Sequence, residues 1–375
     1  MTGSSFIPTL EGAFYSDPAV FALEQDRVFS AAWICTVRAG DVPAAGDFQT
    51  IEVAGESIVA VRGKDGVIRA FFNVCRHRGS RLCSEGSGRM KGAVLCPYHA
   101  WSYGFDGRLI GAPNIAEMSD DDRGDRHLLE IASREWLGYL WLCLADSPPS
   151  FEESVISQVA DRLGDAERID HYAMEALAVG RRIEYEVGAN WKLIVENFME
   201  CYHCGTLHPE LVTVLPEFRK GQATQSQAGH GALFGDGIEG FTVDGDGGFG
   251  RLPGLDEDQD RRYYGMTVTP QVIINLVPDH VIFHRIYPVS VDRTVVICDW
   301  LFDRRVVDGG ADLGRSVELF HRVNQQDFGA VESTQLSMGS RAYRRGGVLV
   351  PVERHIGLFH EWLRGMLAAG AATPS

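Results

Sequence analysis

The chain has 375 residues, of which 45% are hydrophobic and 23% charged, and its formal net charge at pH 7 is −16. This length exceeds what one hydrophobic core usually serves, so the composition predicts a globular protein of two domains. The negative charge argues against nucleic acid as a partner, because phosphates would be repelled, and is compatible with a cationic substrate or a basic redox partner.

No segment has the length of a membrane span, since the longest apolar run, Tyr139 to Ala145, is only as long as a strand. The first residues lack a basic region followed by an apolar one, so we expect no export and a cytoplasmic location. In that setting reduced thiols or metal ligands are expected rather than a disulfide framework. The cysteines concerned are Cys35, Cys75, Cys83, Cys96, Cys143, Cys201, Cys204 and Cys298.

The residue pattern of the first half of the chain changes from helical to strand-like and then reaches a break. Residues 1–40 read as helical, with a start at Asp17 and apolar residues recurring as far as Phe29. From about Asp47 to about Leu144 the chain reads as short alternating strands, such as those over 48–53 and 57–61. The run Ser-Pro-Pro-Ser over 147–150 then predicts a domain boundary.

The second half, residues 148–375, mixes element types. We expect a strand over 182–187, a helix over 191–207, a long Gly/Asp-rich loop over 221–260, strands over 267–302, and helices over 312–338 and after Pro351. The glycines over 245–250 match a dinucleotide pattern by letter only, because no buried strand precedes them. Asp244 and Asp246 imitate half a calcium loop, but Leu255 stands where its glutamate should be.

Two Cys-and-His pairs in the β-rich region form a first candidate metal site. Cys75 and His77 lie in one loop, and Cys96 and His99 follow eighteen residues later. These ligands suit a Rieske [2Fe–2S] cluster, with thiolates on one iron and imidazoles on the other, and they also suit a structural zinc ion. Each loop supplies one residue of each kind, as a cluster with unlike ends requires, which favours the cluster. Cys83 lies outside the pattern and is expected to be a packed thiol.

A second set of candidate ligands, Glu200, His203 and His208, lies in and just after the helix expected over 191–207. Glu200 and His203 would share a face of that helix, whereas His203 and His208 are about 140° apart around it. The two imidazoles converge only if the helix bulges or ends between them, and Pro209 favours an end. With a distant carboxylate they form the facial triad of non-haem iron oxygenases, whose open positions bind O2.

Other residues near these ligands leave choices open. Glu318, Asp327 and Glu332 are all candidates for the carboxylate, and the residues alone do not choose among them. Cys201 and Cys204 flank the expected ligands inside a helix, so we do not interpret them as a redox pair.

The motifs together resemble the α (oxygenase) subunits of Rieske non-haem iron oxygenases over nearly the whole chain. They are Asn-Val-Cys-Arg-His-Arg-Gly (73–79), Cys-Pro-Tyr-His-Ala-Trp-Ser-Tyr (96–103) and Asn-Trp-Lys to His-Pro (190–209). The resemblance implies an α+β fold, with an N-terminal segment (1–40) packed on the catalytic domain, an all-β Rieske domain (41–147), and a helix-grip (START-like) catalytic domain (148–375). The last would have a curved antiparallel sheet and long helices.

The resemblance also assigns the ligands. It implies a cluster held by Cys75, His77, Cys96 and His99, and a mononuclear iron held by His203, His208 and Asp327. Asp327 is chosen because the family places its Asp ligand a few residues before a Glu and a Gln, here Glu332 and Gln335. The resemblance further implies a ring-shaped homotrimer in which Glu200, where many relatives have Asp, links His203 to His99 of the partner subunit.

The form Glu-Asn-x-x-Glu-Cys-Tyr-His-Cys over 196–204 resembles the branch that oxidises quaternary ammonium compounds, such as glycine betaine and proline betaine demethylases. It implies the oxygenase component of a two-component monooxygenase that N-demethylates a small betaine-like substrate. Electrons would come from NAD(P)H through a separate flavin and iron–sulfur reductase. The alternatives are a dioxygenase of aromatic rings or aromatic acids, and a Rieske electron carrier fused to a ligand-binding domain.

Overall fold

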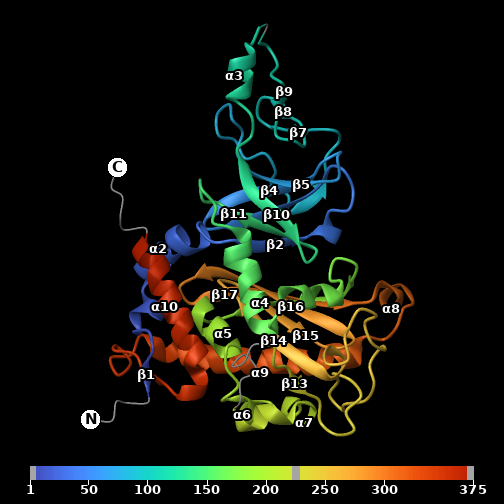
Figure 1. Cartoon of the computed structure of the whole chain (residues 1–375). Coiled ribbons are helices and arrows are strands. Elements are labelled where there is room, and N and C mark those ends of the chain that lie inside the picture. Colours follow the sequence, from blue (N-terminus) through green and yellow to red (C-terminus); the bar gives the residue numbers. More distant parts are fainter. Residues whose placement is uncertain (1–5, 116, 222–228, 370–375) are drawn as a thin grey trace. The chain divides into compact units, whose positions relative to one another are not determined.

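The computed structural model describes residues 6–115, 117–221 and 229–369, which fall into two compact units. The β unit runs from residue 29 to 149, and the mixed unit joins the chain up to residue 28 with the chain from residue 150 onward. The strands of both units pair antiparallel, and most of the helices belong to the mixed unit (Figure 1). The α+β class predicted from the sequence is therefore confirmed.

The described residues of the β unit form a seven-stranded sheet and a three-stranded sheet. The larger sheet has the order β2 (Ile34–Arg38), β11 (Tyr139–Cys143), β10 (Glu130–Trp136), β5 (Ile68–Phe72), β4 (Glu56–Arg62), β3 (Asp47–Val53) and β6 (Ser87–Arg89). The smaller sheet joins β7 (Val94–Leu95), β8 (Ser102–Tyr103) and β9 (Leu109–Gly111), and helix α3 (Asp120–Gly124) follows it. One hydrophobic cluster packs Cys75 and Cys96 with Phe71, Trp101 and Tyr103, so both Cys/His loops rest on the core of this unit.

The helix predicted up to residue 40 is wrong beyond Phe29. Helices α1 (Ala13–Ser16) and α2 (Pro18–Glu24) and a π-helical turn (Gln25–Phe29) are followed by strand β2, which is buried throughout and pairs with β11. The β2 sequence, Ile-Cys-Thr-Val-Arg, contains three β-branched residues, which favour a strand. The helical periodicity on which the prediction rested ends before this point.

The mixed unit contains a six-stranded sheet, counted over its described residues, that curves around a long helix, α9 (Gly314–Met338) (Figure 1). The strand order is β12 (Ala178–Val187), β17 (Arg293–Phe302), β16 (His280–Ser290), β15 (Val272–Leu276), β14 (Arg262–Val268) and β13 (Ala232–Leu233). Phe320 and Val323 of α9 pack in one cluster with Ile282 and Trp300 of the sheet. This arrangement is the helix-grip architecture expected from the resemblance.

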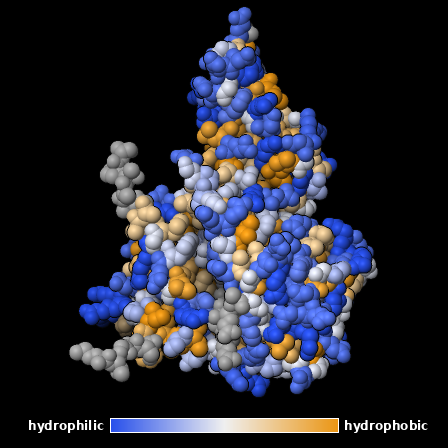
Figure 2. All heavy atoms as spheres, in the orientation of Figure 1, coloured by the Kyte–Doolittle hydropathy of each residue, from blue (hydrophilic) through white to orange (hydrophobic). Residues whose placement is uncertain are grey.

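Shorter elements surround this core. The helices are α4 (Ser157–Leu163), α5 (Trp191–Phe198), α6 (Cys204–Leu207), α7 (Leu211–Val214), α8 (Arg304–Asp308) and α10 (Arg354–Ala369), and β1 (Ile7–Pro8) pairs with β18 (Val348–Leu349). A π-helical turn (Glu152–Ile156) precedes α4, and 3-10 turns occupy Ala39–Asp41, Ala166–Tyr172, Pro216–Lys220, Gln259–Arg261 and Pro351–Glu353. Over the described part of the chain, no helix combines the length and apolarity that crossing a bilayer requires. The face drawn in Figure 2 is mostly hydrophilic, with small separate hydrophobic patches.

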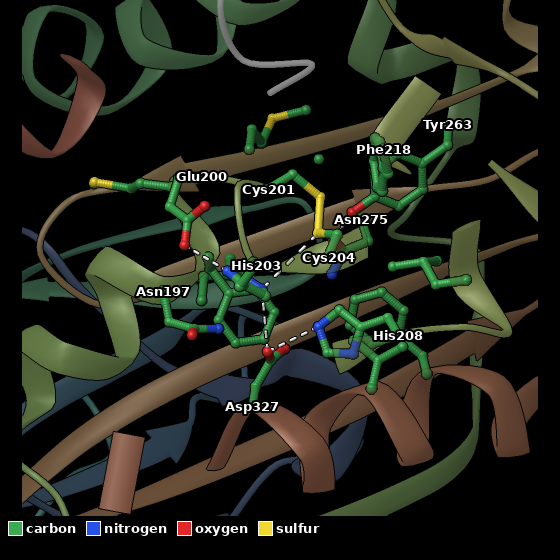
Figure 3. Close-up of a pocket in the computed structure, with 18 residues that line it drawn as sticks. Asn197, Glu200, Cys201, His203, Cys204, His208, Phe218, Tyr263, Asn275 and Asp327 are labelled. Atoms are coloured by element: carbon green, nitrogen blue, oxygen red, sulfur yellow. Dashed lines mark hydrogen bonds and ion pairs between the residues drawn. A yellow bond between two sulfur atoms is a disulfide. The ribbon is translucent and has the colours of Figure 1, made fainter. Parts of the chain in front are cut away.

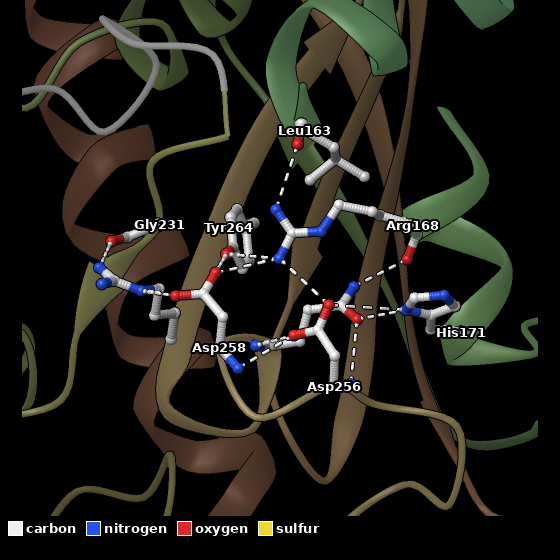
Figure 4. A network of polar contacts seen from close by, with 9 residues as sticks. Leu163, Arg168, His171, Gly231, Asp256, Asp258 and Tyr264 are labelled. Carbon is white, nitrogen blue, oxygen red and sulfur yellow. Dashed lines mark hydrogen bonds and ion pairs between the residues drawn. The ribbon is translucent and has the colours of Figure 1, made fainter. Parts of the chain in front are cut away.

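The long loop expected over 221–260 has neither helix nor strand over 234–258, while residues 222–228 lie outside the described chain. Ion pairs fix its far end (Figure 4). Arg168 Nη2 lies 3.0 Å from Asp258 Oδ2 and 3.5 Å from Asp256 Oδ2, and the Tyr264 hydroxyl donates to Asp258. Nearer the middle, the two aspartates that imitate half a calcium loop both pair with Arg315. One guanidinium group therefore offsets part of the charge of these two carboxylates.

Candidate metal centres

The two Cys/His loops of the β unit have the same backbone construction. The Gly79 N–H donates to the Cys75 carbonyl at 3.0 Å, and the Ala100 N–H donates to the Cys96 carbonyl at 3.1 Å. In each loop the cysteine N–H donates to the carbonyl five residues later, at 2.8 Å. Gly79 and Ala100 both have positive φ, 71° and 57°, which reverses the chain soon after each histidine. Two matched loops therefore present one cysteine and one histidine each.

The four side chains differ in exposure in a way that suits a two-iron cluster. Cys75 and Cys96 are buried, each with 2% of its surface exposed. His77 is exposed and His99 half-buried, and their ring centroids lie 4.7 Å apart. A Rieske cluster has one iron bound by two sulfurs and one bound by two imidazoles, so a buried sulfur pair and an outward imidazole pair fit its unlike ends.

Hydrogen-bond donors surround the two sulfurs. The Tyr103 hydroxyl lies 3.3 Å from Cys75 Sγ and accepts the Arg76 N–H at 3.1 Å, which leaves its own proton available to the sulfur. Burial alone would raise the pKa of Cys96, but backbone N–H groups of the following turn outweigh it and lower that pKa. Cys83 differs, because burial raises its pKa to about 11 with no such donors. Its packing beside the loops agrees with the packed thiol expected there.

The second site lies where the chain between α5 and α6 leaves helical geometry. Asn190 caps α5, and the helix ends at Phe198, so the continuous helix predicted over 191–207 is wrong. The Glu200 carboxylate accepts the Tyr202 N–H, a local bond that competes with helix formation. Glu200 and His203 therefore share no helix face. The one-turn helix α6 instead separates His203 at its start from His208 at its end.

The structure brings three predicted ligands together (Figure 3). His208 Nε2 lies 2.9 Å from Asp327 Oδ1, and His203 Nε2 lies 3.3 Å from the same oxygen. Asp327 projects from α9 and is only 2% exposed. Two imidazoles and one carboxylate thus meet at a point between α9 and the α5–α6 connection.

The other carboxylates of α9 have different contacts. Glu318 binds Arg322 one turn further along the same helix, at 2.6 Å. Glu332 accepts the Gly188 N–H and Gln335 accepts the Asn190 N–H, both at 2.9 Å. The latter two side chains fix α9 to the start of α5 and so hold Asp327 in register with the histidines.

Both imidazoles are oriented through their Nδ1 atoms. Glu200 Oε1 lies 2.5 Å from His203 Nδ1, and Gln326 Oε1 lies 2.7 Å from His208 Nδ1. With Nδ1 engaged, each ring turns Nε2 toward Asp327, the arrangement that outer hydrogen-bond partners impose on metal-binding histidines. Sequence reasoning missed Gln326, whose only signal was its position next to Asp327.

The electrostatics of this point favour a cation. Burial alone would lower the pKa of His203, but the hydrogen bonds and charges of Asp327 and Glu200 raise it to about 10. Burial would likewise raise the pKa of Asp327, and the two imidazoles outweigh it and lower that pKa. Two nitrogens and one carboxylate oxygen that leave further positions open are the ligands of a non-haem Fe(II) site. The residues therefore fit a mononuclear iron.

Cys201 and Cys204 form a disulfide, so the prediction of reduced thiols is wrong for this pair. Their Cα atoms lie 5.0 Å apart, both side chains are buried, and they flank His203. The sequence interpretation placed both cysteines inside a helix. The turn over 199–203 removes that helix and brings the two sulfurs into bonding distance.

A cavity of about 50 Å³ adjoins the three ligands (Figure 3). Its aromatic walls are Phe198, Phe218, Tyr263 and Phe320, and no lysine or arginine lines it within the described ranges. Asn197 also lines it, and its buried Nδ2 has no hydrogen-bond partner among the described residues. The cavity is thus aromatic and acidic, with an amide donor to spare.

Comparison with known proteins identifies the family. Residues 32–127 match the Rieske [2Fe-2S] domain, and residues 174–369 match the catalytic domain of ring-hydroxylating α subunits. The chain belongs to this family of Rieske-type ring-hydroxylating oxygenases. It is an oxidoreductase whose cofactors are a Rieske cluster and a mononuclear iron, with O2 as co-substrate. As an oxygenase subunit it receives NAD(P)H-derived electrons from a separate reductase.

Individual relatives show which members of the family the chain is similar to. The glycine betaine monooxygenase oxygenase subunit of Pseudomonas aeruginosa is 31% identical, over 94% of this chain and 88% of the relative. The carnitine monooxygenase oxygenase subunit of Escherichia coli K12 is 32% identical, over 90% of this chain and 86% of the relative. The quaternary ammonium Rieske monooxygenase CntA with L-carnitine superposes with a TM-score of 0.72, at 26% identity over 96% of both chains. Naphthalene 1,2-dioxygenase from Rhodococcus sp., with a TM-score of 0.73 at 20% identity over 98% of this chain and 95% of that one, shares the fold.

Proposed function

We propose that this oxygenase hydroxylates, and thereby N-demethylates, a small betaine-like quaternary ammonium compound. The observation that carries the proposal is the cavity beside His203, His208 and Asp327, which combines aromatic walls with carboxylates and has no lysine or arginine among its described lining residues. Aromatic faces attract a quaternary ammonium group, which aromatic hydrocarbons and aromatic acids lack. The relatives named for glycine betaine and carnitine support the same substrate class.

In this proposal His203, His208 and Asp327 hold the iron, which when bound supplies the binding and activation of O2. Glu200 and Gln326 keep the two imidazoles turned toward it. The aromatic walls hold the ammonium group and exclude water.

The reaction changes one N-methyl group of the substrate. Oxygenation inserts one atom of O2 into a methyl C–H bond, and the other oxygen atom leaves as water with two electrons from the reductase and two protons. The resulting N–CH2OH group loses its hydroxyl proton to solvent, its C–N bond breaks, and formaldehyde leaves. The nitrogen keeps the electron pair as a tertiary amine.

The outward-facing histidines of the cluster offer a route by which electrons reach the mononuclear iron. We assign the cluster to Cys75, Cys96, His77 and His99, whose imidazoles face outward from the β unit. We also propose a homotrimer in which Glu200, already bound to His203 Nδ1, connects to His99 of the partner subunit. The proposed reductase carries a flavin and an iron–sulfur centre, and a cytoplasmic location stays a prediction.

A second candidate function is hydroxylation of an aromatic ring. The same aromatic walls could pack against a planar hydrocarbon, which gains from ring–ring contacts. An aromatic acid fits less well, because its carboxylate would lie near Asp327 and Glu200 with no ammonium group in the same molecule to offset it. A Rieske electron carrier without oxygenase activity would lack the mononuclear iron, so three irons per chain rather than two would exclude it.

A single turnover tests the proposal. The chemically reduced protein is mixed with O2 and offered separate pools of quaternary ammonium compounds, aromatic hydrocarbons and aromatic acids. We expect formaldehyde and a tertiary amine from the first pool alone. Hydroxylated product from an aromatic pool alone would overturn the proposed substrate class and leave the metal sites untouched.

A further inference from the structure

The disulfide beside the mononuclear site has no role in the function proposed above. Cys204 Sγ lies 3.9 Å from His203 Nε2, the ring nitrogen that faces Asp327. The potential ligand atoms of His203, Cys204 and His208 all lie within 4.8 Å of one another. Cys201 and Cys204 also line the cavity (Figure 3). A sulfur atom therefore sits at the edge of the coordination space.

The oxidation state of this sulfur decides whether it can bind a metal. A disulfide sulfur carries no charge and is a poor ligand, whereas a thiolate is a strong one that favours zinc over iron. On one tetrahedral zinc, a sulfur and a nitrogen ligand lie about 3.5 Å apart. The observed separation of 3.9 Å is close enough that a change of rotamer, once the S–S bond is broken, brings the sulfur into range.

We propose that the Cys201–Cys204 disulfide selects the metal of this site. Oxidised, it keeps the Cys204 sulfur out of the coordination sphere and leaves the two histidines and Asp327 as an open iron site. Reduced, it releases Cys204 as a fourth ligand. Two histidines, one carboxylate and one thiolate fill the tetrahedron of zinc and leave no position for O2. The inference rests on the metal site of the proposed function.

The redox step is a thiol–disulfide exchange with a dithiol. The dithiol gives up two electrons and two protons and becomes a disulfide, the Cys201–Cys204 bond breaks, and both cysteines become thiols. Binding of zinc then replaces the thiol proton of Cys204, which passes to solvent. Cys201 makes no metal contact in either state. The two cysteines therefore have unequal roles, and this inequality can be tested.

The test measures zinc affinity on the full chain with its cluster retained, after the mononuclear site has been emptied with a chelator. Zinc competes with a chromogenic chelator, and Co²⁺ reports sulfur ligation through its thiolate charge-transfer absorption. The oxidised protein is compared with protein reduced by dithiothreitol and desalted without oxygen. Reduction is expected to tighten zinc binding at least about a hundredfold, the size expected of one added ligand in a four-ligand site.

Two substitutions separate ligation from a merely structural effect. Cys201→Ser leaves Cys204 a permanent thiol and should bind zinc tightly without reductant. Cys204→Ser should bind weakly with or without it. Cys298→Ser, at a buried cysteine away from the cavity, is the matched control and should behave as the wild type.

Several results would overturn the inference. These are equal zinc affinities for the two serine variants, no thiolate absorption from Co²⁺ in the reduced wild type, or alkylation of both cysteines in protein never exposed to reductant. The reduced wild type keeps the test valid if a variant fails to fold. Iron retention and turnover by the oxidised wild type are scored separately, so the proposed function stands or falls independently.

Discussion

Removing the buried carboxylate of Glu24 is expected to loosen the segment that leads to the iron site. Lys192 Nζ lies 2.6 Å from Glu24 Oε1, Trp191 Nε1 donates to Glu24 Oε2 at 2.8 Å, and both charged side chains are fully buried. This contact joins α2 to the first turn of α5, the helix that ends just before Glu200. The nearby carboxylate of Glu196 is already bound by Tyr15 and His360.

The magnitude follows from the charge left behind. Glu24→Gln preserves shape but leaves the Lys192 ammonium buried without its carboxylate, and breaking a buried ion pair in this way costs about 3–5 kcal/mol. Burial already lowers the pKa of Lys192, so the lysine can escape by losing its proton. Deprotonating a lysine of ordinary pKa at pH 7 costs about 4.6 kcal/mol, so the loss of stability caused by Glu24→Gln should not exceed about this value.

Hydrogen exchange of the peptides covering α2 and α5 is the suitable assay, because a chain of two units has no single unfolding free energy. A loss of about 3 kcal/mol corresponds to exchange faster by about a hundredfold or more where exchange reports the opening equilibrium. The double variant Glu24→Leu/Lys192→Met should recover most protection. Glu210→Gln, which breaks a half-exposed pair with Arg322, is the control and should change little. Glu24→Gln exchanging at the wild-type rate would refute the argument.

Three further results are expected. The Tyr103 hydroxyl donates to the Cys75 sulfur, and such a hydrogen bond stabilises the reduced cluster, which is the more negative state. Tyr103→Phe removes this donor, so the reduction potential of the cluster should fall by roughly 50 mV in a spectroscopic titration. His203 in the metal-free protein has a pKa of about 10, so loading Fe²⁺ or Zn²⁺ at pH 8 should release a proton to an indicator dye, and metal affinity should rise with pH. Because folding raises the pKa of His203, the protonated imidazole adds to the folding stability of the metal-free protein. This contribution is complete below about pH 6.5 and is lost as the pH rises through about 10. Asp327→Ala should leave two irons per chain instead of three by elemental analysis, and unchanged iron would move the carboxylate ligand elsewhere.

Elements with strong local periodicity could be predicted from the sequence. The alternating residues of β3 and β4 and the long amphipathic pattern of α9 were predicted to within a few residues. Strand β2 was not, because its five buried residues show no alternation and follow directly on a helical pattern. Its pairing with β11, more than a hundred residues later, supplies what the local sequence lacks.

The metal site shows the same division between local and distant information. The residue types and spacing indicated two histidines, but they left Glu318, Asp327 and Glu332 open, and only the family resemblance chose Asp327. The helix break over 199–203 depends on a carboxylate–backbone bond at Glu200 and on the neighbouring disulfide. Gln326 acquires its role only when α9 lies against α6. Such contacts join elements far apart in sequence, where periodicity carries no signal.

The two histidines are oriented by unlike partners, and this difference has a consequence for the iron. A carboxylate acceptor makes an imidazole a stronger ligand than an amide acceptor does. His203, bound to Glu200, therefore responds to any change in charge around that carboxylate, whereas His208, bound to the neutral Gln326, does not. Glu353 belongs to the same electrostatic neighbourhood, since burial and then the charge of Glu200 raise its pKa. A change of charge on the Glu200 side of the site is therefore expected to alter the ligand strength of His203 more than that of His208.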